Sequence, residues 1–376
     1  MIAPPLASDT SRPAIDIVCR VVDYYGDAGI GWRLAAGLAL EHGFETCLWI
    51  DRPDMIAAMA PAGAPHVEVR HLDEFEAGYR PRDVLLTTFD SRISDVARAR
   101  IRAAGERSLR VHFEYLSAEP WIDGCHGLPS LKPDGSKEWM FMPGFTAASG
   151  GLIRERGIAG LRAGFDRASQ DAFLARLGAA GEPGRRVSLF CYPEAPADDW
   201  FAALAAAPEQ TVLFAAHGVA IDSVARFFGV EPEPGRLLRQ GSLALLRIPF
   251  MPQVDYDRLL LACDLNFVRG EDSWIRAHWA RRPFVWQPYI QADGAHLDKL
   301  DAFLAGALAG APAGAAQGLR RFAHAWSGDG CVESAWPDFL AALPAIERQF
   351  ANYVDGLEAQ SDCCTRLAGF IRDRLQ

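Results

Sequence analysis

The sequence predicts an α/β protein with two doubly wound, Rossmann-like domains that face each other across a cleft. Apolar runs of strand length alternate with helical patterns in both halves of the chain. The alternation is interrupted at residues 178–186, a small, polar segment with Gly and Pro that is typical of a linker, and then starts again. A length of 376 residues is sufficient for two such domains.

Composition excludes several classes of protein. Half of the residues are apolar, which is typical of a globular chain, and the net charge of -10 argues against a general nucleic-acid binder. We find neither an apolar run long enough to span a bilayer nor a secretory signal, and we expect a flexible tail over residues 1–14. The eight cysteines show no zinc-type spacing, so a reducing, cytoplasmic location is expected, with the adjacent Cys363 and Cys364 on a helix surface.

The first half opens with a βαβ pattern. A strand is predicted over residues 15–22, a glycine-rich loop over 23–30, a helix over 31–42 that ends at Gly43, and a second strand over 45–50. This order is the usual start of a doubly wound domain.

The glycines of this loop resemble a dinucleotide-binding fingerprint. Gly26, Gly29 and Gly31 lie between strand and helix, and Asp51 ends the second strand. The match is poor because Leu34 occupies the third glycine position. A nicotinamide-dependent dehydrogenase is therefore an alternative that the pattern disfavours.

Two acids near the end of the first strand are a stronger indication of function. Asp23 and Asp27 flank Gly26, and paired carboxylates at a strand end are suited to general-base catalysis or to orienting a cation. A structural role is equally compatible with the residues alone, since Asp27 could cap the following helix and Asp23 could form an Asx-turn.

The rest of the first half continues the pattern. Strands are predicted over residues 84–88 and 109–115, with a helix over 91–104 between them, and a further helix over 171–178. The segment 116–145 is rich in Gly, Pro and aromatic residues and cannot be one regular element. Long ordered loops are usually functional, so this segment could contact a partner or the cleft between the domains.

The second half repeats the architecture without repeating the sequence. Strands are predicted over residues 187–192, 211–216 and 243–250, and helices over 198–207, 253–262, 295–306 and 334–342, followed by one long helical pattern over 343–374.

The segment 263–301 connects a strand at 264–268 to a helix at 274–280 and then to a strand that begins at 283–286. Arg269 and Gly270 follow the first of these strands, and Asp272 and Ser273 are good N-cap residues. A helix N-terminus at the end of a parallel strand favours phosphate binding, which a neighbouring arginine would strengthen. The alternative is that Arg269 only pairs with a neighbouring acid, Glu271 or Asp272.

Together, the two halves predict an acidic side and an anion-binding side of one cleft. This combination is what a nucleotide-sugar glycosyltransferase needs, since one domain holds the diphosphate leaving group while the other activates the acceptor. No DxD-type metal motif is evident in the predicted loops, so a helix dipole and side chains would stabilise the charge of the leaving group.

Six motifs, in matching order from Ile15 to Phe303, resemble the EarP family, the protein-arginine rhamnosyltransferases that modify elongation factor P in bacteria. They are VVDYYGDAGIGWRLAAGLA, FEYLSAEPWIDGCHGLPS, FMPGFTAASGGLIRE, PFMPQVDYDRLL, NFVRGEDSWIRAHWARRPFVWQPY and DGAHLDKLDAF. The chain departs from the usual family pattern at Tyr24-Tyr25 and Ile30-Gly31. These departures do not affect the acids.

The resemblance implies a GT-B fold and an inverting, metal-independent transfer of L-rhamnose from dTDP-β-L-rhamnose to the guanidino group of one arginine. The acceptor would be translation elongation factor P, which the modification activates for relief of polyproline stalling, and no cofactor is implied beyond the donor. Residues 15–180 would form the acceptor-side domain, 181–342 the nucleotide-sugar-binding domain, and 343–376 a C-terminal helical segment.

The resemblance also implies roles for individual residues. Asp23 and Asp27 match the essential aspartates of the family, with Asp27 the favoured general base, and Glu271 matches an essential glutamate. Phe190 and Phe250 would sandwich the thymine base, although packing at a strand end would also explain these two aromatics. The positions that match the donor site are Phe190, Tyr192, Phe250, Gln253, Arg269, Asp272 and Ser273.

The residues alone leave other functions open. A transferase that acts on a small-molecule acceptor would need the same acids and the same phosphate-binding loop. A binding module without catalytic activity would keep the loop at 269–273 but lose its acids, and here all three acids are present. Only the family resemblance selects a protein arginine.

Overall fold

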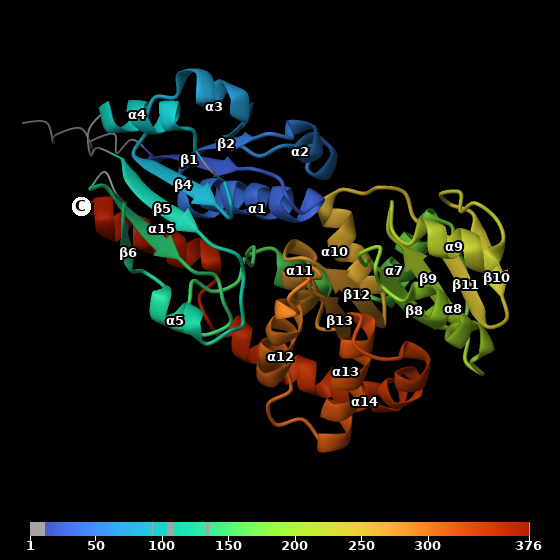
Figure 1. Cartoon of the computed structure of the whole chain (residues 1–376). Coiled ribbons are helices and arrows are strands. Elements are labelled where there is room, and N and C mark those ends of the chain that lie inside the picture. The colour runs from blue at the N-terminus through green and yellow to red at the C-terminus, as the bar shows by residue number, and fades with distance from the viewer. Residues whose placement is uncertain (1–11, 92, 104–107, 133–134, 376) are drawn as a thin grey trace, which may run out of the picture.

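The computed structural model describes residues 12–91, 93–103, 108–132 and 135–375. It contains two α/β domains, each built around one sheet, and the two sheets lie at opposite ends of the molecule in Figure 1. The predicted fold class is therefore confirmed. Residues 1–11 of the predicted tail lie outside the described residues, and Ala14 already belongs to the first strand.

The first sheet has seven strands in the order β3-β2-β1-β4-β5-β7-β6. All neighbouring pairs are parallel except β6 and β7, which are antiparallel. The strands are β1 (Ala14–Cys19), β2 (Glu45–Ile50), β3 (Val67–His71), β4 (Val84–Thr88), β5 (Leu109–Phe113), β6 (Pro129–Leu131) and β7 (Lys137–Phe141). The long segment 116–145 thus supplies two strands to the edge of this sheet, as well as a short helix.

Helices cover both faces of the first sheet, because its central strands are apolar on both sides. The helices of this half are α1 (Tyr24–His42), α2 (Pro53–Met59), α3 (Leu72–Gly78), α4 (Asp95–Ala103), α5 (Trp121–Cys125) and α6 (Ile158–Gly164). Phe75 of α3 and Ile101 of α4 pack in one core cluster, whereas Leu34 and Leu38 of α1 pack in another.

Helix α1 begins at Tyr24 and not at residue 31, so the prediction of a loop over 23–30 was wrong. The glycines that suggested a loop lie inside the helix, where they permit close packing. A Cβ atom on Gly29 would lie 2.8 Å from Oδ2 of Asp272 in the second domain. Gly29 therefore allows α1 to pack directly against the second domain. This contact, and not a loop, explains the glycine at this position.

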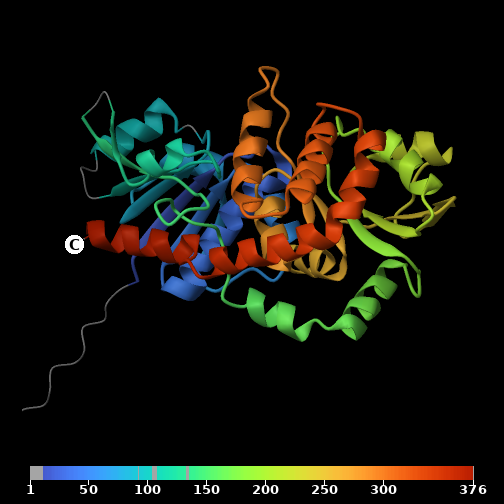
Figure 2. The same ribbon diagram turned by 90° about the horizontal axis from the view of Figure 1, so that it is seen from below.

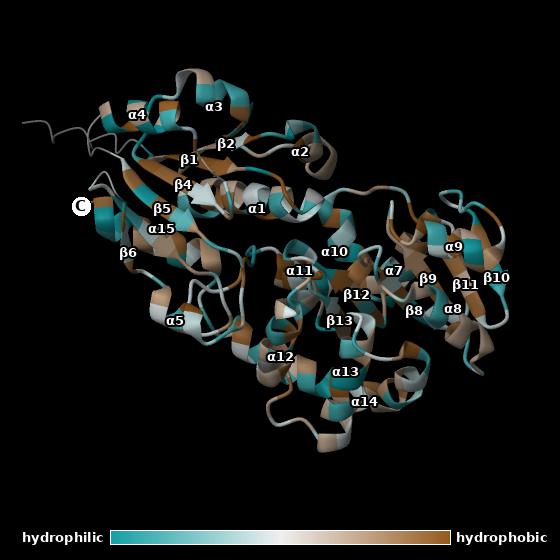
Figure 3. Cartoon of the chain, in the orientation of Figure 1, coloured by the Kyte–Doolittle hydropathy of each residue, from teal (hydrophilic) through white to brown (hydrophobic). Residues whose placement is uncertain are grey.

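The second sheet has six strands in the order β10-β11-β9-β8-β12-β13. Its strands are β8 (Arg185–Leu189), β9 (Thr211–Ala215), β10 (Leu237–Gln240), β11 (Leu243–Arg247), β12 (Leu265–Arg269) and β13 (Phe284–Gln287), and only β10 runs antiparallel to its neighbour. Its helices are α7 (Arg167–Leu177), α8 (Ala197–Ala206), α9 (Ile221–Phe228), α10 (Gln253–Ala262), α11 (Asp272–Ala280), α12 (Ala295–Ala307), α13 (Ala313–Trp326) and α14 (Val332–Glu358). Figure 3 shows apolar residues gathered on the strands of both sheets.

Helix α7 precedes the predicted boundary at residue 180 but packs with the second domain. Its residues Phe173 and Leu174 belong to a core cluster with Val212 of β9, Leu246 of β11 and Leu259 of α10. The change from one domain to the other therefore lies between β7 and α7.

The predicted helical pattern over 343–374 is two helices, and the first of them starts earlier than expected. Helix α14 has 27 residues, contains Pro337 and Pro344, and ends at Glu358, and α15 (Cys363–Leu375) follows after a short break. Figure 2 shows these two helices running along one side of the molecule from the second domain to the first. None of the described helices combines the length and the apolar character needed to cross a membrane.

Helix α15 completes the core of the first domain by packing against α1. Cys363 and Cys364 are buried in this contact, so their expected place on a helix surface was wrong. A Cβ atom on Gly37 of α1 would lie only 2.6 Å from Sγ of Cys364. The last helix of the chain is therefore part of the first domain and not an appendage.

Candidate active site

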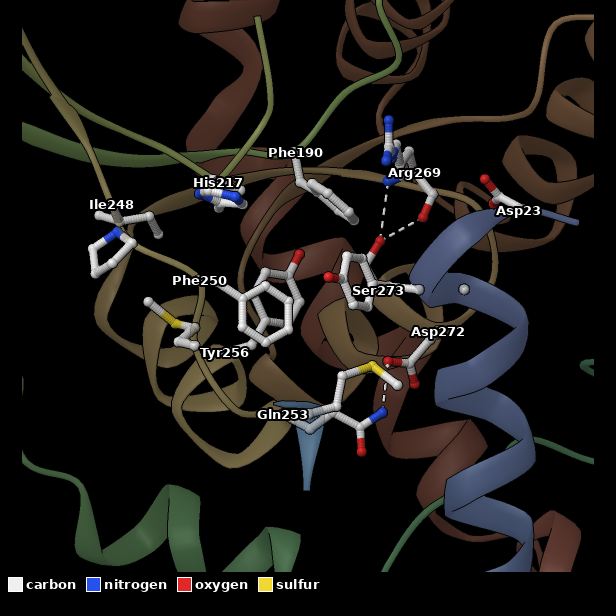
Figure 4. Close-up of a pocket in the computed structure, with 16 residues that line it drawn as sticks. Asp23, Phe190, His217, Ile248, Phe250, Gln253, Tyr256, Arg269, Asp272 and Ser273 are labelled. Atoms are coloured by element: carbon white, nitrogen blue, oxygen red, sulfur yellow. Dashed lines mark hydrogen bonds between the residues drawn. The ribbon is translucent and has the colours of Figure 1, made fainter. Parts of the chain in front are cut away.

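A pocket lies where the start of α1 faces the C-terminal ends of strands in the second sheet (Figure 4). This edge is where open α/β sheets bind ligands, because loops and helix N-termini gather there. The described residues that line the pocket include Asp23, Tyr25 and Gly26 from the first domain and Phe190, His217, Phe250, Gln253, Tyr256, Arg269, Asp272 and Ser273 from the second.

Aromatic rings form a large part of the wall of this pocket. Phe250 follows β11, and its ring centroid lies 4.8 Å from that of Tyr25 at the start of α1. Phe190 follows β8 and lies 6.0 Å from the ring of Tyr256. Such flat apolar walls are suited to holding a planar ring of a ligand.

Arg269 brings a positive charge into the same pocket. Its guanidinium carbon lies 4.4 Å from the ring centroid of Phe190 and 4.6 Å from that of Tyr192, and its Nη1 donates to the carbonyl oxygen of Cys191 at 2.9 Å. Among the described residues, no carboxylate forms an ion pair with Arg269. The structure therefore does not support the alternative in which Arg269 only pairs with Glu271 or Asp272. The guanidinium has hydrogen-bond donors left for an anion.

The loop that follows β12 is held by its own side chains. The Ser273 hydroxyl accepts from the backbone N–H of Arg269 at 3.1 Å and donates to the carbonyl oxygen of the same residue. Gly270 has a φ of +56°, and a Cβ atom there would lie 2.6 Å from Oδ2 of Asp23. Only glycine therefore lets the loop approach the first domain so closely.

Helix α11 begins at Asp272, earlier than the expected start at residue 274. Glu271 occupies the N-cap position, and neither Asp272 nor Ser273 acts as the expected cap. No side chain in the described part of the chain caps this helix, so the first N–H groups of α11 keep their capacity to bind an anion.

Asp272 lines the pocket, but its carboxylate already has partners. Its Oδ1 accepts from Nε of Arg33 at 2.7 Å, and its Oδ2 accepts from the amide of Gln253 at 3.3 Å. Burial raises the pKa of Asp272, and the charge of Arg33 opposes that rise.

Asp23 and Tyr192 form a hydrogen bond that links the two domains. The phenol of Tyr192 donates to Oδ2 of Asp23 at 2.7 Å, and the backbone N–H of Tyr192 donates to the amide oxygen of Gln287. Burial raises the pKa of Tyr192, so the phenol keeps its proton and remains a donor. Tyr192 thus contacts both Asp23 and Arg269.

Asp27 lies in the first turn of α1 and is almost completely buried, with 3% of its surface exposed. Its Oδ2 accepts from the backbone N–H groups of Val22 and Asp23, at 2.7 and 2.9 Å. Burial raises the pKa of Asp27 despite these hydrogen bonds, and the nearby charge of Asp23 adds to the rise. Within the described part of the chain, Oδ1 accepts no hydrogen bond, so this oxygen is free to take a proton.

Glu271 connects the second domain to the loop after β5. Its Oε1 accepts from the backbone N–H of Leu116 at 2.9 Å. Burial raises the pKa of Glu271 well above the ordinary value, and the charges of Asp27, Glu114 and Asp23 contribute to this rise. The three predicted catalytic acids are therefore close enough to influence one another, and together they form a region suited to a cation.

Several features of this site were not predicted, among them the two that follow. Tyr25 lines the pocket although its position was noted only as a departure from the family pattern, and Arg33 contacts Asp272, which is 239 residues away. The sequence contains no local signal for the second contact. Asp51, the residue that suggested a ribose ligand, instead accepts from the backbone N–H of Val21 at 3.0 Å and supports the loop before α1.

Comparisons with known proteins agree with this geometry. Residues 15–372 match the family model described as Elongation-Factor P (EF-P) rhamnosyltransferase EarP. The chain is 40% identical to a protein-arginine rhamnosyltransferase of Pseudomonas aeruginosa and 37% identical to one of Pseudomonas putida, in each case over 96% of this chain and 99% of the relative.

Solved structures give the same result for the fold. A structure described as the basis for EarP-mediated arginine glycosylation of translation elongation factor EF-P superimposes with a TM-score of 0.70 at 28% identity, over 96% of this chain and 99% of the other. The glycosyltransferase VinC, in complex with dTDP, shares the fold with a TM-score of 0.54 at 10% identity, over 96% of this chain and 98% of the other. The chain therefore belongs to the EarP family of elongation factor P rhamnosyltransferases and has the GT-B glycosyltransferase architecture.

Proposed function

We propose that this protein transfers L-rhamnose from dTDP-β-L-rhamnose, with inversion and without a metal ion, to a guanidino nitrogen of one arginine of translation elongation factor P. The observation that carries the proposal is the opposition of charges across one pocket. Arg269 and the start of α11 line the pocket from the second domain, and Asp23 lines it from the first. Asp27 and Glu271 do not line the pocket, but their charges interact with that of Asp23. The names of the relatives support the acceptor, since they are protein-arginine rhamnosyltransferases.

The second domain would hold the donor. Phe190 and Phe250 provide apolar walls for the thymine base, with Gln253 near them. Arg269, the Ser273 hydroxyl and the first N–H groups of α11 would bind the diphosphate, because charge-assisted hydrogen bonds and a helix N-terminus both favour a phosphate. Tyr192 would keep Arg269 in place by stacking beneath its guanidinium.

The first domain would hold the acceptor arginine. A guanidinium is protonated in proteins and has no lone pair to donate. Transfer of a guanidinium proton to an ordinary aspartate, before the nitrogen attacks the sugar, would be uphill by about 8 pKa units, or roughly 11 kcal/mol. We therefore place proton loss together with, or after, formation of the new bond.

The reaction would then proceed as one displacement at the anomeric carbon. Asp23 and Glu271 hold the guanidinium and weaken its delocalisation, which makes the electron pair of one nitrogen available. This nitrogen attacks the anomeric carbon from the face opposite to the diphosphate. The C–N bond forms as the C–O bond to dTDP breaks, the electron pair leaves with dTDP, and the proton passes from nitrogen to Asp27. Arg269 and the start of α11 stabilise the negative charge that develops on the leaving group.

The test is the intact mass of unmodified elongation factor P after incubation with this protein and dTDP-β-L-rhamnose. We expect a gain of one deoxyhexose that persists in EDTA and disappears when the target arginine is changed to lysine. Absence of the gain, with dTDP still bound, would overturn the acceptor and favour a small-molecule acceptor. Absence of both the gain and dTDP binding would overturn the proposal as a whole.

A further inference from the structure

Four buried charged residues and the half-buried Glu155 form a network between the two domains, next to the pocket that Asp272 lines. Arg33 of α1 contacts three acids: Glu155 at 2.7 Å, Asp272 at 2.7 Å and Asp257 at 3.6 Å. Arg276 of α11 pairs with Asp257 at 2.8 Å and also with Glu155. We call these five residues the interdomain charge network.

The network is buried more deeply than ion pairs on a protein surface. Arg33 and Arg276 are 6% and 2% exposed, and Asp257 and Asp272 are below 10%. Buried ion pairs give little net stability, because the cost of removing charges from water offsets their attraction. Stability is therefore a weak explanation for this network, whereas the fixing of one arrangement of the two domains is a stronger one.

Arg33 is the member that joins the two halves of the site. It lies on α1, six residues after Asp27, which corresponds to about 9 Å along the helix axis. Its partner Asp272 is the first residue of α11, directly after the loop that carries Arg269, Gly270 and Glu271. The Arg33–Asp272 pair therefore connects the helix of the proposed base to the loop of the proposed phosphate site.

The packing around this pair leaves little freedom. Gly29 on α1 has no room for a side chain, because a Cβ atom would lie 2.8 Å from Oδ2 of Asp272 and 3.0 Å from Nε2 of Gln253. Both carboxylate oxygens of Asp272 are thus engaged, one by Arg33 and one by Gln253.

We infer that Arg33 is a positioning residue. It holds Asp272, and through it the start of α11 and the loop 269–273, at a fixed separation from the acids of α1. The contribution of Arg33 to catalysis rests on the proposed function. Its positioning of the loop 269–273 can be tested without a donor or an acceptor substrate.

A matched control exists at the opposite end of α11. Arg162 donates to the carbonyl oxygen of Trp279 at 3.0 Å and to Glu358 at 2.8 Å. It therefore anchors the C-terminal end of the same helix, which is the end remote from the pocket. Arg33→Gln and Arg162→Gln each remove one arginine that ties α11 to a neighbouring element. Only Arg33→Gln affects the N-terminal end of α11, which is connected to the loop 269–273.

The experiment compares amide hydrogen exchange of the unliganded full chain in the wild type, Arg33→Gln and Arg162→Gln. We expect Arg33→Gln to raise exchange in peptides that cover residues 269–275 by about tenfold or more, since a buried charge-assisted hydrogen bond is lost. Arg162→Gln should leave that segment unchanged. Equal exchange at 269–275 in the wild type and Arg33→Gln would overturn the inference.

Binding of dTDP, measured by calorimetry, is the second readout. Its dissociation constant should rise about tenfold in Arg33→Gln and stay unchanged in Arg162→Gln. Arg33→Lys keeps the positive charge but lacks the planar guanidinium, so its dissociation constant for dTDP should lie between those of the wild type and Arg33→Gln. The lysine variant replaces the glutamine variant in both experiments if the latter does not fold. If the wild type itself does not bind dTDP, the proposed donor is wrong, and the exchange comparison alone then decides the inference.

Discussion

The two strand–helix junctions that form the site have the same local architecture and opposite chemistry. At the β1–α1 junction, Asp27 turns back and accepts the N–H groups of Val22 and Asp23, so a carboxylate of the chain itself fills the region where an external anion could bind. At the β12–α11 junction, none of the described side chains caps the helix, and Arg269 is the last residue of the strand.

The comparison teaches that a helix N-terminus alone does not define an anion site. Both helices present N–H groups and the positive end of a dipole at the C-terminal edge of a parallel sheet. The first junction uses the N–H groups just before its helix to hold a buried acid with a raised pKa, and the second leaves the start of its helix uncapped beside a guanidinium. The side chains at each junction therefore decide which side attracts a cation and which an anion.

The largest effect is expected from Asp27→Asn, which removes the proposed base and leaves its shape. Transfer to elongation factor P should fall about 10³-fold, a typical contribution of a general base. Since burial raises the pKa of Asp27, its charged form is disfavoured in the folded protein, so the variant should be at least as stable as the wild type. Single-turnover mass spectrometry and a melting curve test this together. An active variant would remove Asp27 from the mechanism.

The opposite junction is tested by Arg269→Gln. Loss of a charge-assisted contact should weaken dTDP binding about ten- to a hundredfold while leaving the affinity for thymidine unchanged. Arg247→Gln is the matched control, because Arg247 ends the nearby strand β11 but donates to the carbonyl oxygen of Pro232, away from the pocket. Calorimetry with both ligands gives the comparison. Equal losses for dTDP and thymidine would show that Arg269 does not serve the phosphates.

A smaller effect is expected when the link between the junctions is removed. Tyr192→Phe loses the hydrogen bond to Asp23 but keeps the ring beneath Arg269. We expect kcat to fall about three- to tenfold, equivalent to one hydrogen bond, with dTDP affinity unchanged.

Tyr79→Phe is the control for this experiment, since Tyr79 donates to the buried Asp16 at 2.9 Å, remote from the cleft. That variant should lose stability and keep its kcat. A change in dTDP affinity in Tyr192→Phe would mean that the phenol acts on the donor side instead.

The smallest effect concerns stability and pH. Burial raises the pKa of Glu271, so its stabilising contribution is complete below the ordinary carboxyl pKa and is lost as the pH rises through the folded value. Glu271→Gln is always neutral and can still accept from the N–H of Leu116. Its melting temperature should match that of the wild type near about pH 4 and exceed it by a few degrees near neutral pH. A difference that does not depend on pH would contradict a raised pKa.

Much of the fold followed from the pattern of the chain. The strands 45–50 and 84–88 and the helix 253–262 have the predicted bounds, because their apolar runs and flanking turn residues are unambiguous. The start of α1 was missed because Gly26, Gly29 and Gly31 resemble a loop. Gly29 is explained by the packing of α1 against the second domain, and Gly31 by its packing against β1 and β2, which are tertiary effects. Helix α13, rich in Ala and Gly, was not predicted, although its buried residues recur at helical spacing.

The composition of the site was easier to predict than its connections. Seven of the residues named from the sequence line one pocket: Asp23, Phe190, Phe250, Gln253, Arg269, Asp272 and Ser273. The bonds between Tyr192 and Asp23, and between Arg33 and Asp272, join residues 169 and 239 positions apart. No local spacing encodes such contacts, because they depend on how the domains pack.

The return of α15 to the first domain has a consequence for the order in which the chain is made. Leu367 and Ile371 are fully buried beside α1, yet they follow all elements of the second domain in the chain. Domains generally fold as units during synthesis, with the N-terminal one first. Here the first domain cannot bury this face of α1 until α15 has been made, after every element of the second domain. The second domain, whose elements from α7 to α14 are contiguous, can finish its core earlier than the domain that was started first.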